Sequence, residues 1–463
     1  MEYFSRSMVS LKEDRSFKFH PNCKKLQITH LIFADDLLLF AKGEAFSVQK
    51  LYQCIRHFGA VSGLEANPDK SSIYYGGVED SVKAEIANIL GFKEGSFPIK
   101  YLGVPLISKR LSFMDCNPLF EKITGQFMNW TKNRKLSYAG RLQVIKSIIL
   151  GVLIYWTSNY ILPVKVLHKI DEICRKFLWS ATDQTSRSPL VSWDKVCLGM
   201  NQGGLGIFSA QIWNIASALR SIWFIHTNKE SLWIKWIHGK YLKHGNIWQV
   251  RAKPDDSWMW KQVIKTRDKV LNEFGGADNV TNLIRSCYIN SKLKLSALYR
   301  KLSPETNLVP WHKTVGGGLN VPKHSFINWL VVQNRLLTQD RLIKRGIISA
   351  NSCYLCSGAR MESRDHLFFE CNFSCYIWNS IMDWLNFRWK SCNLRLLLNW
   401  FTRSRGKGIQ AQLRRLALTA SIYILWQERN ARLFTQKFKS AEHLVKVIKF
   451  EISTIMLNSP PLI

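Results

Sequence analysis

Acidic residues are scarce in this sequence. Its 463 residues include 33 Asp and Glu against 65 Lys and Arg, which gives a formal net charge of +32 and an isoelectric point of about 9.8. A globular chain this basic usually meets a polyanion, most often a nucleic acid. The alternative is a basic surface that binds nothing specific. The hydrophobic content of 46% and the aromatic content of 12% indicate a globular chain and not a disordered one.

Long apolar segments are also lacking. The first twenty residues, MEYFSRSMVSLKEDRSFKFH, contain no apolar core of the length that a signal peptide needs. The most apolar later stretch, Ile148 to Trp156, is too short to span a bilayer. We therefore expect a protein of the nucleus or the cytoplasm with no membrane partner. Its eleven cysteines are then expected to be thiols or metal ligands and not disulfides.

Two further absences concern enzymatic sites. The glycine clusters NQGGLG and TVGGGLN lack the following Lys-Ser/Thr of a phosphate loop, so we interpret both as turns. After Asp383 the chain contains no Asp, whereas a ribonuclease H site needs several convergent carboxylates to hold its metal ions. We therefore expect neither a phosphate loop nor a ribonuclease H domain.

The hydrophobic periodicity predicts an α+β chain. Up to about residue 110, short strands alternate with a helix over 46–58, and helical spacing dominates beyond. Two helices are predicted next: one with Phe120, Ile123, Phe127 and Trp130 on one face, and one capped by Ser137 with Leu142, Ile145, Ile149 and Val152. The Trp and Leu residues of 181–324 are predicted to form helical core, the alternative being exposed Trp rings that stack on bases.

The segment ITHLIFADDLLLF places Asp35 and Asp36 between two short apolar runs, a pattern typical of a tight hairpin. The simplest interpretation is that the two residues only form the turn, because Asp tolerates turn geometry. Alternatively, carboxylates at a rigid hairpin tip suit Mg²⁺, which prefers hard oxygen ligands and serves phosphoryl transfer. Two adjacent Asp residues alone do not decide between these interpretations.

The segment CYLCSGARMESRDHLFFEC contains a C-x₂-C knuckle followed by a His and a third Cys. Together Cys353, Cys356, His366 and Cys371 offer the closed tetrahedral donor set of a structural Zn²⁺. Such a site contributes folding energy and leaves no position open for catalysis. The alternative is a group of buried cysteines with a surface His. Cys375, one turn beyond Cys371, could replace it as a ligand.

The order of these motifs resembles the carboxyl-terminal half of a reverse transcriptase palm, most closely that of plant LINE-type retrotransposons. The resemblance rests on the FADD hairpin, the helix after it, SGLEANPDKS, YLGVPL, the Cys/His cluster and SWDKVCLGMNQGGLGI. It implies that Asp35 and Asp36 bind catalytic Mg²⁺ and that Lys70 is the lysine of the next motif. Without the resemblance, Lys70 would be interpreted as an ordinary surface lysine. The implied primer grip is Tyr101, Leu102 and Gly103.

The resemblance also implies a domain order. It comprises a partial palm of antiparallel hairpins plus a helix (1–110), a thumb-like helical region (111–180), a Trp-rich helical connection (181–324), a zinc-binding domain of the reverse transcriptase type (325–385) and a basic helical tail (386–463). The thumb-like region is expected to follow the backbone of an RNA and DNA template-primer. Its basic cluster consists of Lys132, Arg134, Lys135, Arg141 and Lys146.

One departure from the family pattern concerns the third carboxylate, which a working reverse transcriptase takes from an earlier palm strand. Before Asp35 the chain offers Glu2, Glu13 and Asp14, none of them on an apolar strand. We therefore expect an amino-terminally truncated reverse transcriptase remnant, with nucleotides as its sole small-molecule substrates and little or no RNA-directed DNA polymerase activity. Its FADD hairpin should leave an edge and an apolar face uncovered. The alternative is a non-enzymatic, zinc-containing nucleic-acid-binding protein.

Overall fold

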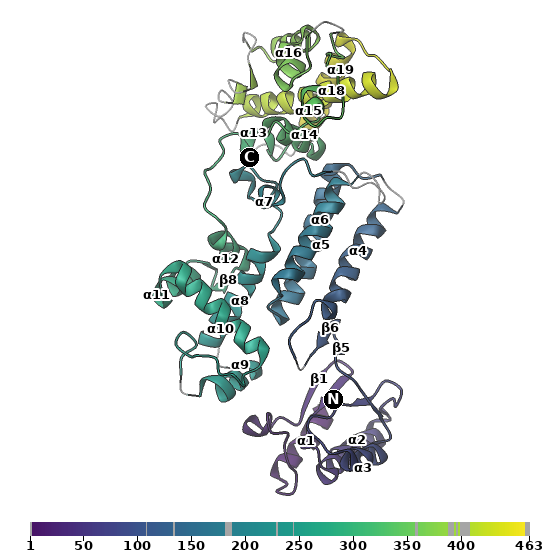
Figure 1. The fold of residues 1–463 in the computed structure, drawn as a ribbon, viewed down its shortest axis with the longest axis vertical. Helices are drawn as coiled ribbons and strands as arrows, with labels where there is room; N and C mark the ends of the chain where they lie inside the picture. The colour runs from purple at the N-terminus through teal and green to yellow at the C-terminus, as the bar shows by residue number, and fades with distance from the viewer. Residues whose placement is uncertain are drawn as a thin grey trace. The chain divides into compact units, whose positions relative to one another are not determined.

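The computed structural model describes residues 2–107, 109–132, 135–180, 188–227, 230–243, 245–356, 360–387, 393–394, 397–398 and 408–458. The organisation is mixed α+β, as predicted: helices predominate (Figure 1). The described residues also form four two-stranded sheets. The chain divides into two compact units, each described here by itself. Unit 1 comprises Met1–Pro118, Trp156–Pro163 and Asn214–Lys301, and unit 2 comprises Leu119–Tyr155, Val164–Trp213 and Leu302–Ile463.

Unit 1 combines short strand pairs with helices. Its helices are α1 (Glu2–Glu13), α2 (Ala45–Ser62), α3 (Asp80–Leu90), most of α8 (Ala210–Thr227), α9 (Leu232–Ile237), α10 (Trp258–Phe274), α11 (Ala277–Arg285) and α12 (Leu295–Leu302), with short turns η1 (Lys24–Leu26), η2 (Met114–Cys116) and η4 (His238–Leu242). Its strands are β1 (His30–Phe33), β2 (Asp36–Leu39), β3 (Ser72–Ile73), β4 (Lys93–Glu94), β5 (Ile99–Tyr101), β6 (Val104–Leu106), β7 (Tyr288–Ile289) and β8 (Lys292–Leu293). The β3–β4 pair is parallel, and the β1–β2, β5–β6 and β7–β8 pairs are antiparallel.

The predicted FADD hairpin is β1–β2, and one of its faces packs on helices. Ile32, Leu37 and Leu39 contact a core whose buried residues are Phe4, Met8 and Leu11 of α1, Phe17, and Leu51 of α2. Because side chains alternate along a strand, Leu31 and Phe33 point away from this core and are 40% and 57% exposed. Within the described residues no third strand pairs with the hairpin. Both outer edges of this two-stranded sheet are thus unpaired within the described residues, and the side chains of Leu31 and Phe33 on one face are exposed.

The tryptophans of 181–324 are mostly core residues, as the helical interpretation predicted. In unit 1, Trp223 of α8, Trp248 of the segment between η4 and α10, and Trp260 of α10 are buried. Trp233 of α9 is the exception, with 48% of its surface exposed. The base-stacking alternative therefore applies to few of these rings.

Unit 2 is helical in its described part. Its elements are α4 (Asn117–Thr131), α5 (Tyr138–Asn159), α6 (Val164–Trp179), α7 (Trp193–Cys197), η3 (Met200–Gln202), α13 (His312–Val315), α14 (Pro322–Val332), α15 (Gln339–Lys344), η5 (His366–Glu370), α16 (Asn372–Trp384), α18 (Ile409–Thr435) and α19 (Ala441–Leu457). The apolar faces predicted for α4 and α5 are buried, and Ser137 Oγ accepts from the backbone N–H of Gly140 at 3.2 Å. Trp130 departs from the prediction and is 47% exposed, because α4 ends one residue later.

The apolar run 148–156 lies within a longer helix than the sequence indicated. By length and composition α5, with 22 residues and a mean hydropathy of 1.3, is long and apolar enough to cross a bilayer. Half of that stretch is buried inside the protein. Because the core helix of a folded domain has the same character, α5 by itself does not indicate a membrane protein.

Candidate functional site

The predicted zinc ligands converge in unit 2. The ligand atoms of Cys353, Cys356, His366 and Cys371 all lie within 4.8 Å of one another. Cys353 Sγ is 4.0 Å from Cys371 Sγ, and Cys356 Sγ is 3.5 Å from His366 Nε2. Two sulfurs bound tetrahedrally at about 2.3 Å from zinc would be about 3.8 Å apart, so the spacing fits this ion.

The chain delivers these ligands by local turns. Cys353 and Cys356 flank a tight turn, His366 begins the one-turn π-helix η5, and Cys371 directly precedes α16. The Cys371 N–H donates to the His366 carbonyl at 2.8 Å, which fixes the last two ligands relative to each other. Residues up to 18 positions apart in sequence therefore reach one point without help from a distant strand.

The protonation states in the cluster fit a cation. The pKa of Cys371 is lowered, first by the adjacent Cys353 thiol and then by backbone N–H groups at the start of α16. The pKa of Cys353 is raised by the same contact and by burial. Burial lowers the pKa of His366, which keeps its imidazole neutral as a metal ligand must be. Binding of a divalent cation would displace the thiol protons, because the thiolate is the metal ligand.

Cys375 does not belong to the ligand set. Its thiol donates to the Phe369 carbonyl at 3.1 Å, and burial raises its pKa. Cys371 is instead fully buried among the other ligands. The structure therefore favours Cys371 over Cys375 as the fourth ligand.

A buried ion pair that the sequence did not reveal supports the cluster. Glu362, inside the zinc motif, is fully buried and accepts from Arg429 of α18 at 2.6 and 3.0 Å. The same carboxylate accepts from the Gln339 N–H at 3.0 Å, and the Glu362 backbone exchanges hydrogen bonds with the Asn351 side chain. In the sequence, the signal for this ion pair was a charged residue, Arg429, within an apolar helix. Its partner Glu362 could not be identified from the sequence, because it lies 67 positions away.

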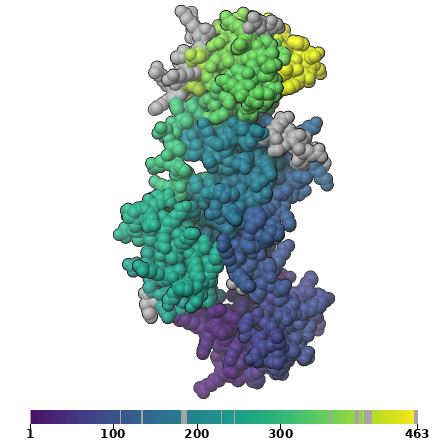
Figure 2. Space-filling view, in the orientation of Figure 1, coloured from purple at the N-terminus to yellow at the C-terminus, as the bar shows by residue number. Residues whose placement is uncertain are grey.

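A second arginine of α18 holds the knuckle itself. Arg432 donates to the carbonyls of Tyr354 and Leu355 at 3.2 and 2.9 Å, between the first two zinc ligands, and to Glu428 at 2.8 Å. Helices α18 and α19 pack against α14 and α16, and Figure 2 shows this part of the chain as a continuous green-to-yellow body. Helix α18 therefore contacts the knuckle directly, and α19 packs on α16, the helix that follows Cys371.

The Asp pair occupies the tip of the β1–β2 hairpin in unit 1. Ala34 and Asp35 form the two-residue turn, and Asp36 begins β2 opposite Phe33. Ala34 has a positive φ of 54°, a conformation that favours glycine. Both carboxylates are exposed to solvent.

The implied primer grip lies near the Asp pair. Tyr101 ends β5, and Leu102 and Gly103 form the turn to β6 with φ values of 47° and 78°. The pKa of Tyr101 is raised, mainly by burial and further by the negative charge of Asp36. The two hairpins of unit 1 therefore bring Asp36 and Tyr101 within electrostatic range.

Neither Lys70 nor the three carboxylates that precede the hairpin in the sequence (Glu2, Glu13 and Asp14) are grouped with the Asp pair around a common metal position. Lys70 is exposed in a turn that the Asn67 side chain caps. Asp14 binds the Ser16 N–H at 2.9 Å and Lys50 at 3.0 Å, and chiefly the Ser16 hydroxyl lowers its pKa to about 2. Among the residues that the structure describes, the zinc cluster is the one group of three or more ligand atoms spaced to hold a metal ion.

The residues of the basic cluster of unit 2 differ in their exposure to solvent. Lys132 and Lys135 are exposed, whereas Arg141 donates to the Phe177 carbonyl at 3.0 Å and lies over its ring. Lys146 is half-buried, and burial lowers its pKa. Arg134 lies outside the described residues. The exposed lysines are thus better placed than Arg141 and Lys146 for phosphate contacts.

Two family models match the chain. One, described as reverse transcriptase (RNA-dependent DNA polymerase), covers residues 4–106, which include the Asp hairpin and the Tyr101 turn. The other, described as zinc-binding in reverse transcriptase, covers residues 294–378, which include all four zinc ligands. These matches indicate a protein related to the reverse transcriptases of retrotransposons. The second match and the Cys/His geometry together support zinc binding.

One curated protein is similar to part of the chain. It is named "Putative ribonuclease H protein" of Arabidopsis thaliana and is 29% identical over 179 residues. The alignment covers 37% of this chain and 28% of that protein. The chain therefore matches less than a third of the length of this relative.

Proposed function

We propose that the chain is a plant LINE-type reverse-transcriptase-related protein that binds an RNA and DNA template-primer in the nucleus or the cytoplasm. The palm (1–110), thumb-like region (111–180), connection (181–324), zinc-binding domain (325–385) and basic tail (386–463) belong to this proposal. The single observation that carries it is the occurrence of the reverse transcriptase match and the zinc-binding match, in that order, in one strongly basic chain.

Nucleic-acid binding is supported by charge. The exposed Lys132 and Lys135 follow α4, and the chain carries 65 basic against 33 acidic residues. Contacts between lysine and phosphate release counterions, so affinity should fall steeply with salt concentration. In this proposal the zinc cluster is structural, because all four of its positions are filled by protein ligands.

Polymerase activity of this chain by itself is proposed to be little or none. Asp35 and Asp36 would hold the Mg²⁺ that neutralises charge during nucleotide transfer, with Tyr101 to Gly103 as primer grip and Lys70 as the lysine of the next motif. Two exposed carboxylates are a weak site for this ion, and no third carboxylate joins them in the described part of the chain. Since positioning supplies most of the catalysis in phosphoryl transfer, a loosely held ion contributes little.

The incomplete Asp site favours a second candidate, a non-enzymatic zinc-containing nucleic-acid-binding protein. In that case binding tolerates the loss of both Asp residues and depends on the lysines. The two candidates share the nucleic-acid partner and differ in whether the hairpin acts on it.

The deciding experiment is primer extension on an RNA template with Mg²⁺, using the wild-type chain and the double variant Asp35→Asn/Asp36→Asn. We expect no extension by either, together with template-primer binding that weakens from low to high salt. Extension by the wild type that the double variant loses would contradict the inactivity. Binding that is unchanged by salt and by Lys132→Gln/Lys135→Gln would contradict the nucleic-acid contact.

A further inference from the structure

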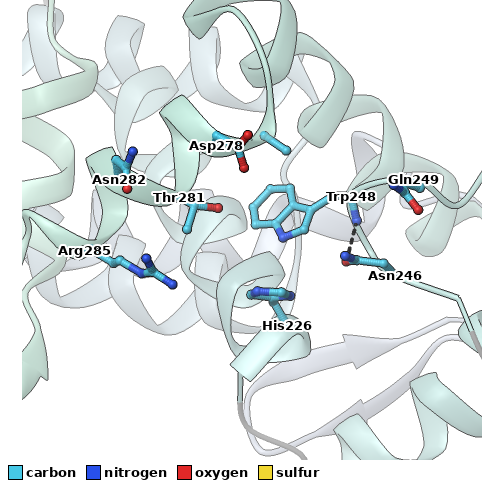
Figure 3. A pocket seen from close by; sticks show the side chains of 9 residues that line it. His226, Asn246, Trp248, Gln249, Asp278, Thr281, Asn282 and Arg285 are labelled. Carbon is cyan, nitrogen blue, oxygen red and sulfur yellow. Dashed lines mark hydrogen bonds between the residues drawn. The ribbon is translucent and has the colours of Figure 1, made fainter.

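Unit 1 contains a pocket remote in sequence from the Asp hairpin. Its volume is about 460 Å³, and it is enclosed by the end of α8, the segment 246–249 and α11 (Figure 3). His226 and Trp248 form its aromatic wall, and polar side chains of α11 lie opposite. Neither the reverse transcriptase match nor the zinc-binding match covers these residues.

Helix α11 turns one polar face to the pocket. Asp278, Thr281, Asn282 and Arg285 are spaced i, i+3, i+4 and i+7, so they lie on one side of the helix, and all four line the pocket. Val280 and Ile284 of the same helix are fully buried in unit 1. Seven residues correspond to about 10 Å along a helix, so a carboxylate and a guanidinium stand at opposite ends of the pocket.

The α11 side chains are available to a ligand. Within the described residues, Asp278, Thr281, Asn282 and Arg285 form no side-chain hydrogen bond and no ion pair. On the opposite side, Asn246 Oδ1 accepts from the backbone N–H of Trp248 at 3.1 Å, and the indole ring of Trp248 is buried. The His226 ring packs edge-to-face on that indole at 5.7 Å. The pocket therefore combines an apolar aromatic wall with uncommitted donors and acceptors.

A basic segment adjoins the pocket. Residues 231–254 contain no Asp or Glu, and their lysines are Lys235, Lys240, Lys243 and Lys253. This segment is tied to the pocket, because His238 Nε2 lies 2.8 Å from the carbonyl of Ile225, the neighbour of His226. A polyanion is therefore favoured along the approach.

We propose that the pocket holds one unpaired nucleotide of a nucleic-acid strand, with its phosphate at Arg285 and its base edge at Asp278. An arginine matches a phosphate, and a carboxylate accepts from the amino groups that bases carry on their edges. Aromatic walls with amide and hydroxyl groups are typical of sites for unstacked bases. The inference rests on the proposed nucleic-acid binding and adds a single-strand site in unit 1 to the contacts assigned to unit 2.

The first test measures binding of labelled single-stranded and duplex oligonucleotides to the full chain by fluorescence anisotropy. Arg285→Gln should weaken single-strand binding about tenfold and lower the salt slope by about one, without affecting the duplex. Arg300→Gln, on the exposed surface of α12, is the control of equal charge. Equal losses for the two variants, or equal losses on single strand and duplex, would overturn the site.

The second test separates base contact from phosphate contact. Asp278→Asn should change the preference among homopolymer strands by about threefold to tenfold and leave the salt slope unchanged. Asp278 and Arg285 are both exposed, so the Asp278→Asn and Arg285→Gln variants should fold as the wild type does. An Asp278→Asn variant with unaltered preference would remove the base from this end of the pocket.

The third test locates the strand by photocrosslinking with 5-iodouracil oligonucleotides and peptide mapping. Crosslinks within 246–249 or 277–285 that Arg285→Gln loses would support the proposal. Crosslinks confined to other segments, on a chain that still binds nucleic acid, would overturn it and leave the proposed function intact. Displacement by a nucleoside monophosphate that binds the wild type but not Arg285→Gln would assign the pocket to a free nucleotide instead of a strand.

Discussion

The two metal motifs of this chain differ in completeness. The zinc motif supplies four ligands from residues 353–371, and their atoms lie within 4.8 Å of one another in a buried cluster. The Asp hairpin supplies two exposed carboxylates, and no further ligand joins them in the described residues. When all the ligands of a metal site come from one short segment, the site can form once that segment folds. When some ligands must come from elsewhere in the chain, the site also depends on which segments pack beside it.

The largest expected effect concerns removal of a zinc ligand. Cys353→Ser should lose bound zinc and unfold the surrounding segment, because structural zinc contributes on the order of 10 kcal/mol in small zinc domains. Metal content by mass spectrometry and hydrogen exchange across α15 and α16 would report this. Cys375→Ser is the matched control: it should keep the metal and cost about 1 kcal/mol or less, because the serine hydroxyl can still donate to the Phe369 carbonyl. Equal zinc loss in the two variants would contradict the ligand assignment.

The next effect concerns the buried pair behind the cluster. Arg429→Met leaves the fully buried Glu362 carboxylate without its partner, which should cost about 3–5 kcal/mol of unfolding free energy. Urea denaturation of unit 2 measures this. Arg364→Met is the control, because its pair with Asp365 is partly exposed and worth about 1 kcal/mol or less. Similar losses for the two arginines would show that burial of the pair has no energetic role.

A half-buried carboxylate with a different environment, Asp171, sharpens this comparison. Burial raises the pKa of Asp171 in α6 to about 6, above its ordinary value of 3.8. The folded protein therefore binds more protons than the unfolded chain between these pH values, so its stability falls as pH rises through this window. Asp171→Asn should stabilise the protein by up to about 3 kcal/mol at pH 8 and give no gain at pH 3.5. Equal effects in urea titrations at the two pH values would contradict the shift.

The smallest expected effect returns to the Asp hairpin. Ala34 has a φ of 54° in the turn, so Ala34→Gly should relieve strain and stabilise unit 1 by about 1 kcal/mol. Ala34→Val should have the opposite sign, because a β-branched side chain is least tolerated at positive φ. Thermal unfolding of both variants measures the difference. If both changes destabilise the protein, the turn is not the origin of the strain.

Local features of the fold could be predicted from the sequence. The alternation around Asp35 gave the β1–β2 hairpin, and the helical spacing of 46–58 lies within α2. The spacing of the four zinc ligands was sufficient because every ligand lies within 19 residues of the others. In each case the interactions that decide the structure join neighbours in the sequence.

Long-range features could not be predicted. The Glu362–Arg429 pair joins residues 67 positions apart, and a buried arginine has the same sequence pattern as an exposed one. The approach of Asp36 to Tyr101 and the pocket between α8 and α11 depend on packing that no local pattern encodes. The exposure of Trp130 depends on where α4 ends, which periodicity fixes only to within a few residues.

The hydrogen bonds from α18 to the knuckle have a practical consequence for any fragment of this chain. The zinc-binding match ends at residue 378, yet the Arg429 and Arg432 side chains that satisfy Glu362 and the Tyr354 and Leu355 carbonyls come from beyond residue 408. A fragment cut at the end of the match would contain every zinc ligand and still expose the apolar sides of α14 and α16. The smallest piece expected to stay soluble with its metal extends to the end of α19 at Leu457.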